Sequence, residues 1–129
     1  PLPEGATALV YSRGSVPATS LGMLQKGMTS VTAASKTTYT AVAGDQIVVD
    51  TVANPVTITL PSSPAVGDEV TIMDGSASNG FATNNCIIDR GGEPIEGSAA
   101  NDTLATNNQC VTLIYSNATK GWLYKSTNQ

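Results

Sequence analysis

Histidine is absent from the 129-residue sequence, and cysteine and charged residues are scarce. Without an imidazole, the chain has no Ser-His-Asp or Cys-His nucleophile pair, no histidine acid–base catalyst and no histidine-containing zinc site. Its two cysteines are too few for a zinc site built from four thiolates. Charged residues make up 12% of the chain, about half of the roughly 25% that is usual. We therefore predict that the protein is not an enzyme and holds neither a metal ion nor a cofactor.

Long apolar runs and an excess of basic residues are also missing. No run of apolar residues is long enough to span a bilayer. The N-terminus also lacks the positively charged segment followed by an apolar segment that is typical of a signal peptide. Six Lys and Arg against ten Asp and Glu disfavour a nucleic-acid partner. We therefore expect neither a membrane nor a nucleic acid as partner. The opening Pro-Leu-Pro is typical of a chain that has lost its initiator Met, so we expect a complete small protein.

Threonine and serine are abundant, with 17 and 12 copies, which favours strands over helices. The clearest strand is residues 56–60, where Val, Ile and Leu alternate with Thr. We predict an all-β fold, a small antiparallel β-sandwich or barrel-like knob. The expected strands are residues 37–41, 46–50, 56–60, 69–74, 86–89, 110–115 and 121–125.

Two pairs of segments are nearly repeated. Residues 44–50 resemble 67–74, and residues 82–86 resemble 105–110. Two copies are too few for a solenoid, which needs at least about three repeats. We interpret each copy as a turn that precedes a strand.

The first 36 residues differ from the rest, with a net charge of +2 against −6 for residues 37–129. Apolar side chains at Leu21, Leu24 and Met28 have helical spacing, but glycines interrupt it. We predict an extended N-terminal arm at residues 1–36 and a knob at residues 37–129. The arm either docks on another surface or packs on its own domain. Its candidate contact residues are Arg13, Leu21, Met23, Leu24, Lys26 and Met28.

Each cysteine, Cys86 and Cys110, lies in a short apolar run, so we favour free thiols in the core, with a single disulfide as the alternative. Asp45 and Asp68 each follow a glycine at the start of a strand. Such residues can bind a hard cation through oxygen, but an Asp after Gly more often hydrogen bonds its own backbone to set a turn.

Trp122 and Tyr124 fall on the same side of the last predicted strand. Their rings could stack on a glycan. Aromatic residues are also frequent in cores and subunit interfaces, and we favour that second interpretation.

About two-thirds of the chain, from Tyr39 to Tyr124, resembles a β-rich module of tailed-bacteriophage virion proteins. The module occurs at the ends of tail fibres and as free-standing head or tail decoration proteins. The segments that carry the resemblance are residues 39–45, 56–61, 64–68, 81–85, 95–97, 111–115 and 121–122.

The resemblance implies a homotrimeric structural protein. We expect a capsid decoration, cement or head-fibre protein on the virion surface, made in the host cytoplasm and anchored through residues 1–36. Its expected partners are other copies of itself and the major capsid protein or another virion protein. The alternative is a tail-fibre or collar component whose knob binds a host-surface glycan.

Overall fold

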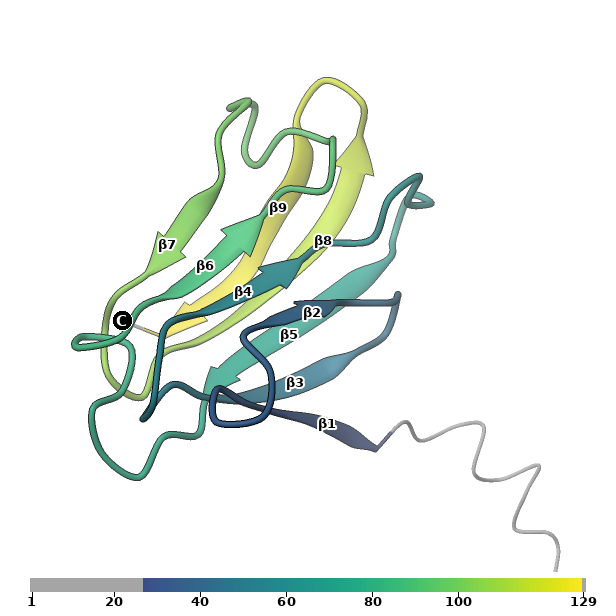
Figure 1. Cartoon of the computed structure of the whole chain (residues 1–129). Coiled ribbons are helices and arrows are strands. Elements are labelled where there is room, and N and C mark those ends of the chain that lie inside the picture. The colour runs from purple at the N-terminus through teal and green to yellow at the C-terminus, as the bar shows by residue number, and fades with distance from the viewer. Residues whose placement is uncertain (1–26, 129) are drawn as a thin grey trace, which may run out of the picture.

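The computed structural model describes residues 27–128, which contain nine strands and no helix. The strands form two sheets that pack as the layers of a sandwich (Figure 1). Five of the six candidate arm contacts, all except Met28, lie outside the described residues. The strands are β1 (Met28–Thr32), β2 (Thr38–Thr40), β3 (Gln46–Asp50), β4 (Val56–Thr59), β5 (Glu69–Asp74), β6 (Cys86–Asp89), β7 (Asp102–Leu104), β8 (Cys110–Asn117) and β9 (Gly121–Asn128).

The first six strands alternate between the two sheets. Strands β1, β3 and β5 pair in parallel in one sheet, and β2, β4 and β6 pair in parallel in the other. The chain therefore winds through three successive coils, β1–β2, β3–β4 and β5–β6. We call residues 28–89 the coil stack. Equivalent residues stack on one another, as Val31 does on Val49 and Tyr39 on Ile58.

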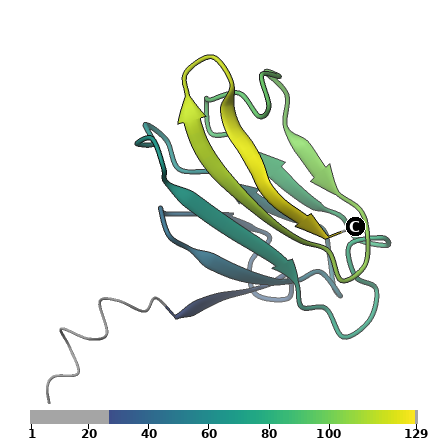
Figure 2. The ribbon, with the colours of Figure 1, turned by 180° about the vertical axis from the view of Figure 1, so that it is seen from behind.

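The last three strands pair in antiparallel fashion and extend both sheets beyond the coil stack. Strand β7 joins β6, while β8 joins β5 and forms a hairpin with β9. We call residues 102–128 the antiparallel cap. The final orders are β1-β3-β5-β8-β9 and β2-β4-β6-β7, and Figure 2 shows the five-stranded sheet from its outer side.

The all-β, sandwich-like prediction is confirmed, but the antiparallel prediction is wrong for the coil stack, and the sheets do not close into a barrel. Alternation of apolar residues specifies which face of a strand is buried, not the direction of its neighbour. The two near-repeats in the sequence do not reveal the three stacked coils formed by β1 to β6. Strands β1, β3 and β5 begin at residues 28, 46 and 69, so unequal connections hide the repeat.

Strand β1 belongs to the folded unit, so the sheet begins before the boundary expected at residue 37. It pairs with β3 along its whole length, and Val31 is only 1% exposed. The backbone N–H of Ala33 continues the contact by donating to the carbonyl of Asp50 at 2.9 Å. Met28 begins β1 and is 59% exposed, so it lies at the edge of the knob.

The core consists of the apolar side chains that point inward from both sheets. Strand β4 shows the rule, since Val56 and Ile58 are fully buried while Thr57 and Thr59 point outward. Each such buried side chain contributes about 1.5–3 kcal/mol through the hydrophobic effect. The largest fully buried side chains include Trp122 and Phe81, the latter from the loop between β5 and β6.

Candidate functional surfaces

The outer face of the five-stranded sheet carries a patch of half-buried apolar side chains. Val48, Met73 and Cys110 are lateral neighbours on β3, β5 and β8, and Ile114, further along β8, pairs with Leu123 on β9. We call these five residues the outer patch. They alternate with core residues along their strands, so they point away from the core of the sandwich.

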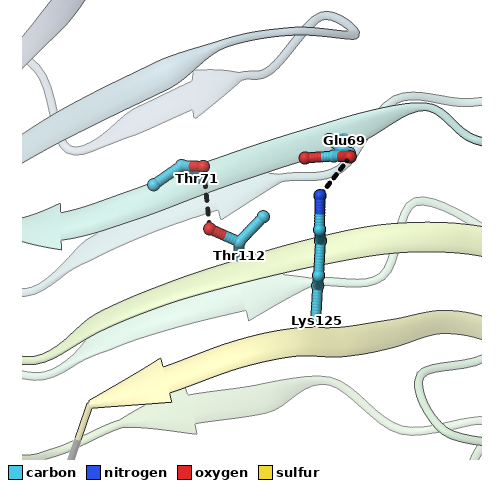
Figure 3. Close-up of polar contacts among 4 residues, drawn as sticks. All are labelled: Glu69, Thr71, Thr112 and Lys125. Carbon is cyan, nitrogen blue, oxygen red and sulfur yellow. Dashed lines mark hydrogen bonds and ion pairs between the residues drawn. The ribbon is translucent and has the colours of Figure 1, made fainter.

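Satisfied polar groups lie across the same face (Figure 3). The hydroxyls of Thr71 and Thr112 are 3.0 Å apart in a hydrogen bond between β5 and β8. The Nζ of Lys125 is 2.9 Å from Oε2 of Glu69, so its side chain crosses β8 from β9 to β5. The pairing of β8 with β9 skips Lys125, and this irregularity accompanies the turn of its side chain over the sheet. The face therefore combines apolar side chains with paired hydroxyls and a paired charge.

The outer face of the four-stranded sheet is different in chemistry. Thr38, Thr57, Ile87 and Thr103 form one lateral row across β2, β4, β6 and β7. A second row begins with Thr40 and Thr59 and ends with an acidic residue of β6. Hydroxyl groups dominate this face, so it gains less than the outer patch from being covered by another protein.

The third surface is a groove on the side of the sandwich where the edge strands β7 and β9 lie (Figures 1 and 2). The hydroxyl of Tyr124 in β9 donates a hydrogen bond to Oδ2 of Asp102 in β7. Two hollows of about 310 and 320 Å³ border this pair, and both are lined by Tyr124 and Asp102. We call the two hollows the side groove. Burial, followed by the hydrogen bond and charge of Asp102, raises the pKa of Tyr124 well above its ordinary value.

The aromatic pair predicted from sequence is divided between two environments. Trp122 is 0% exposed and meets Tyr115 edge-on, with ring centroids 5.5 Å apart, so the core interpretation is confirmed and stacking on a glycan is wrong for this residue. Tyr124 is half-buried and borders the side groove. Sequence reasoning predicted Tyr124 but missed Asp102, because 22 residues separate them and no motif links them.

The two Gly-Asp segments form equivalent turns, as the near-repeat predicted. Oδ2 of Asp45 accepts the N–H of Val42, and Oδ2 of Asp68 accepts the N–H of Ala65, each at 2.9 Å. The preceding glycines have φ values of 88° and 95°, which favour glycine. The turn interpretation of both carboxylates is therefore confirmed. Between residues 27 and 128, no cluster of three or more His, Cys, Asp or Glu could hold a metal ion.

Both cysteines are free thiols, so the disulfide alternative is wrong. Cys86 is fully buried in the core, as predicted, and burial together with the charge of Asp74 raises the pKa of its thiol to about 12. Cys110 is half-buried and points outward in the outer patch, so its predicted core position is wrong. Within the described part of the chain, no helix is long and apolar enough to cross a membrane.

Asp74, at the end of β5, connects the coil stack to the antiparallel cap. Its Oδ2 accepts the N–H groups of Phe81 and Asn108, and its Oδ1 accepts that of Ser76. Asn108 precedes β8, so this carboxylate holds together two loops that are distant in sequence. Burial raises the pKa of Asp74, but the hydrogen bonds lower it by more, and the net pKa is below the ordinary value.

No protein-family model matches the chain, and no curated protein matches it. The likeness to phage virion modules therefore depends on the sequence segments named above.

Proposed function

We propose that the protein is a structural component of a tailed-phage particle, a homotrimeric decoration protein on the capsid surface. The single observation that carries the proposal is the outer patch on the five-stranded sheet. The sequence resemblance over residues 39–124 supplies the class of particle. In the proposed homotrimer, the three copies of the chain contact one another through this face.

The chemistry of the outer patch suits contact with other copies of the same chain. Apolar side chains and methionine are enriched at the centre of interfaces, whereas unpaired charges are depleted. The patch has this composition, and two charged residues of the same face, Glu69 and Lys125, already neutralise each other. Closed rotational symmetry lets every copy cover its apolar side chains in the same way.

Sedimentation equilibrium or light scattering after size exclusion tests the assembly. We expect the full chain to have the mass of a trimer. Met73→Lys and Ile114→Lys place a charge in the patch and should each give a folded monomer. Ile87→Lys is the matched control, because Ile87 is half-buried on the outer face of the other sheet, and this variant should remain trimeric. A monomeric wild-type chain, or an equal effect of the control, would overturn the assembly.

Residues 1–26 provide the proposed anchor, since the knob itself begins at β1. A truncated chain should therefore start at residue 27 rather than 37, because removing β1 would expose the core around Val31. We expect this truncated chain to form a soluble trimer that does not bind phage particles. Decoration of particles by the truncated chain would show that the anchor assignment is wrong.

Immunoelectron microscopy of particles tests the position on the virion. Hundreds of copies over the head would support a capsid decoration protein. A few copies or a dozen, at the tail or collar, would overturn the capsid assignment and favour the tail-fibre alternative.

A further inference from the structure

The side groove lies on the side of the sandwich where a side-chain hydrogen bond joins β7 and β9, the edge strands of the two sheets. Its two hollows, about 310 and 320 Å³, adjoin at Tyr124 and Asp102. Such an arrangement offers two neighbouring subsites with an aromatic ring at their border. A short linear ligand with repeated units fits it better than a single compact ligand.

The groove is lined mainly by groups that exchange hydrogen bonds with hydroxyls. Thr103, Thr106 and Gln109 line the first hollow, and Ser98 and Asn101 line the second. Except for Gln109, these residues are exposed. The side chain of Thr103 belongs to the outer face of the four-stranded sheet, and Oδ1 of Asn101 already accepts the N–H of Arg90, which leaves its amide N–H groups to donate. Hydroxyl and amide groups both donate and accept, as the hydroxyls of a sugar do.

The charge of the groove selects against anionic ligands. The charged residues that line the hollows are Asp102 and Glu96, and both are acidic. Since carboxylates accept hydrogen bonds and donate none when ionised, they suit a ligand with many O–H donors. Phosphates, sulfates and uronic acids would instead face two like charges.

Tyr124 is held in position before any ligand arrives. Its hydroxyl is bound to Asp102, and its backbone pairs with Leu113 of β8, so both ends of the residue are fixed. A ring that is already ordered loses little conformational entropy on binding. Its face is an apolar surface next to polar groups, a combination that accommodates the C–H and O–H faces of a sugar ring.

We propose that the side groove is a binding site for a neutral oligosaccharide, with Tyr124 as the stacking platform and with Asp102, Glu96 and Asn101 as hydrogen-bonding partners of the sugar hydroxyls. The site is a property of the isolated knob. It depends neither on trimer formation nor on attachment to a particle.

Titration of the full chain with defined oligosaccharides tests the proposal by calorimetry and by changes in NMR chemical shift. The neutral probes are linear oligomers of glucose, galactose, mannose and N-acetylglucosamine, and the anionic probe is oligogalacturonate. We expect at least one neutral oligomer to bind and the anionic one not to bind. Absence of binding by every neutral probe at millimolar concentration, or binding of the anionic probe alone, would overturn the proposal.

Variants locate the site. Ala105→Trp and Ala100→Trp fill the first and second hollows from exposed positions, and each should weaken binding by about tenfold or more without lowering thermal stability. Ala77→Trp is the matched control, since Ala77 is exposed but lines neither hollow. Tyr124→Phe should retain the ring and part of the affinity. Full affinity in both groove variants would place the ligand elsewhere and contradict the proposal. Light scattering and particle binding are measured separately, so failure here leaves the virion proposal standing.

Discussion

The coil stack and the antiparallel cap belong to the same sandwich but differ in how their strands are paired. Strands of the coil stack have three to six residues, and each one pairs with strands that come a full coil earlier or later. The cap instead contains the two longest strands, β8 and β9, joined directly as a hairpin. The comparison teaches that the stack obtains its register from distant neighbours, whereas the cap obtains most of its register from a local turn.

The largest expected effect is at that local turn. Gly121 has a φ of 71°, and a Cβ at this position would overlap the carbonyl oxygen of Pro94. The variant Gly121→Ala combines backbone strain with a clash against backbone, so we expect a loss of about 3 kcal/mol or more in the free energy of unfolding. Urea denaturation of the purified variant measures the loss.

Gly92→Ala is the matched control for Gly121→Ala. Gly92 has a φ of 100°, but no atom lies within 4 Å of an added Cβ. Strain alone should cost about 1–2 kcal/mol. Equal losses in the two variants would show that the contact of the hairpin turn with Pro94 is not essential.

The next largest losses of stability are expected from two variants that create comparable cavities, one in the coil stack and one in the antiparallel cap. Ile58→Ala in β4 of the stack and Leu113→Ala in β8 of the cap each remove part of a fully buried side chain. Each should lose about 2–5 kcal/mol. Both regions share one core, so we expect one cooperative transition. Trp122 reports on the cap, and Ile58→Ala should shift its fluorescence transition together with the far-UV circular dichroism. A separation of the two signals would mean that stack and cap unfold independently.

The hydrogen bonds of Asp74, which connect the coil stack to the antiparallel cap, are expected to make a smaller and pH-dependent contribution to the free energy of unfolding. Asp74→Asn removes the charge that accepts three backbone N–H groups, and we expect a loss of about 1.5–3 kcal/mol at pH 7. The pKa of Asp74 in the folded protein lies below 3.8, so its contribution is present at neutral pH. It should disappear as the pH falls below about 4 through the folded pKa.

Denaturation of wild type and Asp74→Asn at pH 7 and pH 3 measures this dependence. Asp50→Asn serves as control, because the carboxylate of Asp50 accepts the N–H of Val52 within its own turn. A stability difference for Asp74→Asn that is independent of pH would rule out the charge as the cause.

The smallest expected effect belongs to the exposed ion pair that also links stack and cap. Lys125 and Glu69 have side chains that are 55% and 38% exposed. A double-mutant cycle with Lys125→Ala and Glu69→Ala should give a coupling of about 0.5 kcal/mol or less, and added salt should reduce it. A coupling well above 1 kcal/mol would contradict the expectation that this exposed pair contributes little to the stability of the contact between stack and cap.

Sequence reasoning succeeded where a strand alternates strongly. The prediction of residues 46–50 and 86–89 coincides with β3 and β6, and the threonines of β4 point outward as expected. It failed for β1 and β7. The apolar residue Met28 was included in a helical spacing, while β7 has only three residues and therefore almost no pattern to detect. The direction of strand pairing was predicted incorrectly for the coil stack, because the same alternation of apolar and polar residues is compatible with parallel and with antiparallel neighbours.

Prediction of the surfaces was less complete than prediction of the strands. The outer patch is assembled laterally, from Val48, Met73 and Cys110 on different strands, so no linear motif encodes it. The side groove likewise needs β7 beside β9. Only Tyr124 could be proposed from sequence, because an aromatic residue in the last strand is visible without knowledge of pairing.

The coil stack also has a consequence for how such a protein can change over evolutionary time. Each coil contacts mainly the coils next to it, so its stability is shared between its own residues and two interfaces. Duplication or deletion of a coil would alter the width of both sheets by one strand while leaving the β8–β9 hairpin and the groove beside it intact. The fold thus separates a part that can vary in size from a part that can keep a binding specificity.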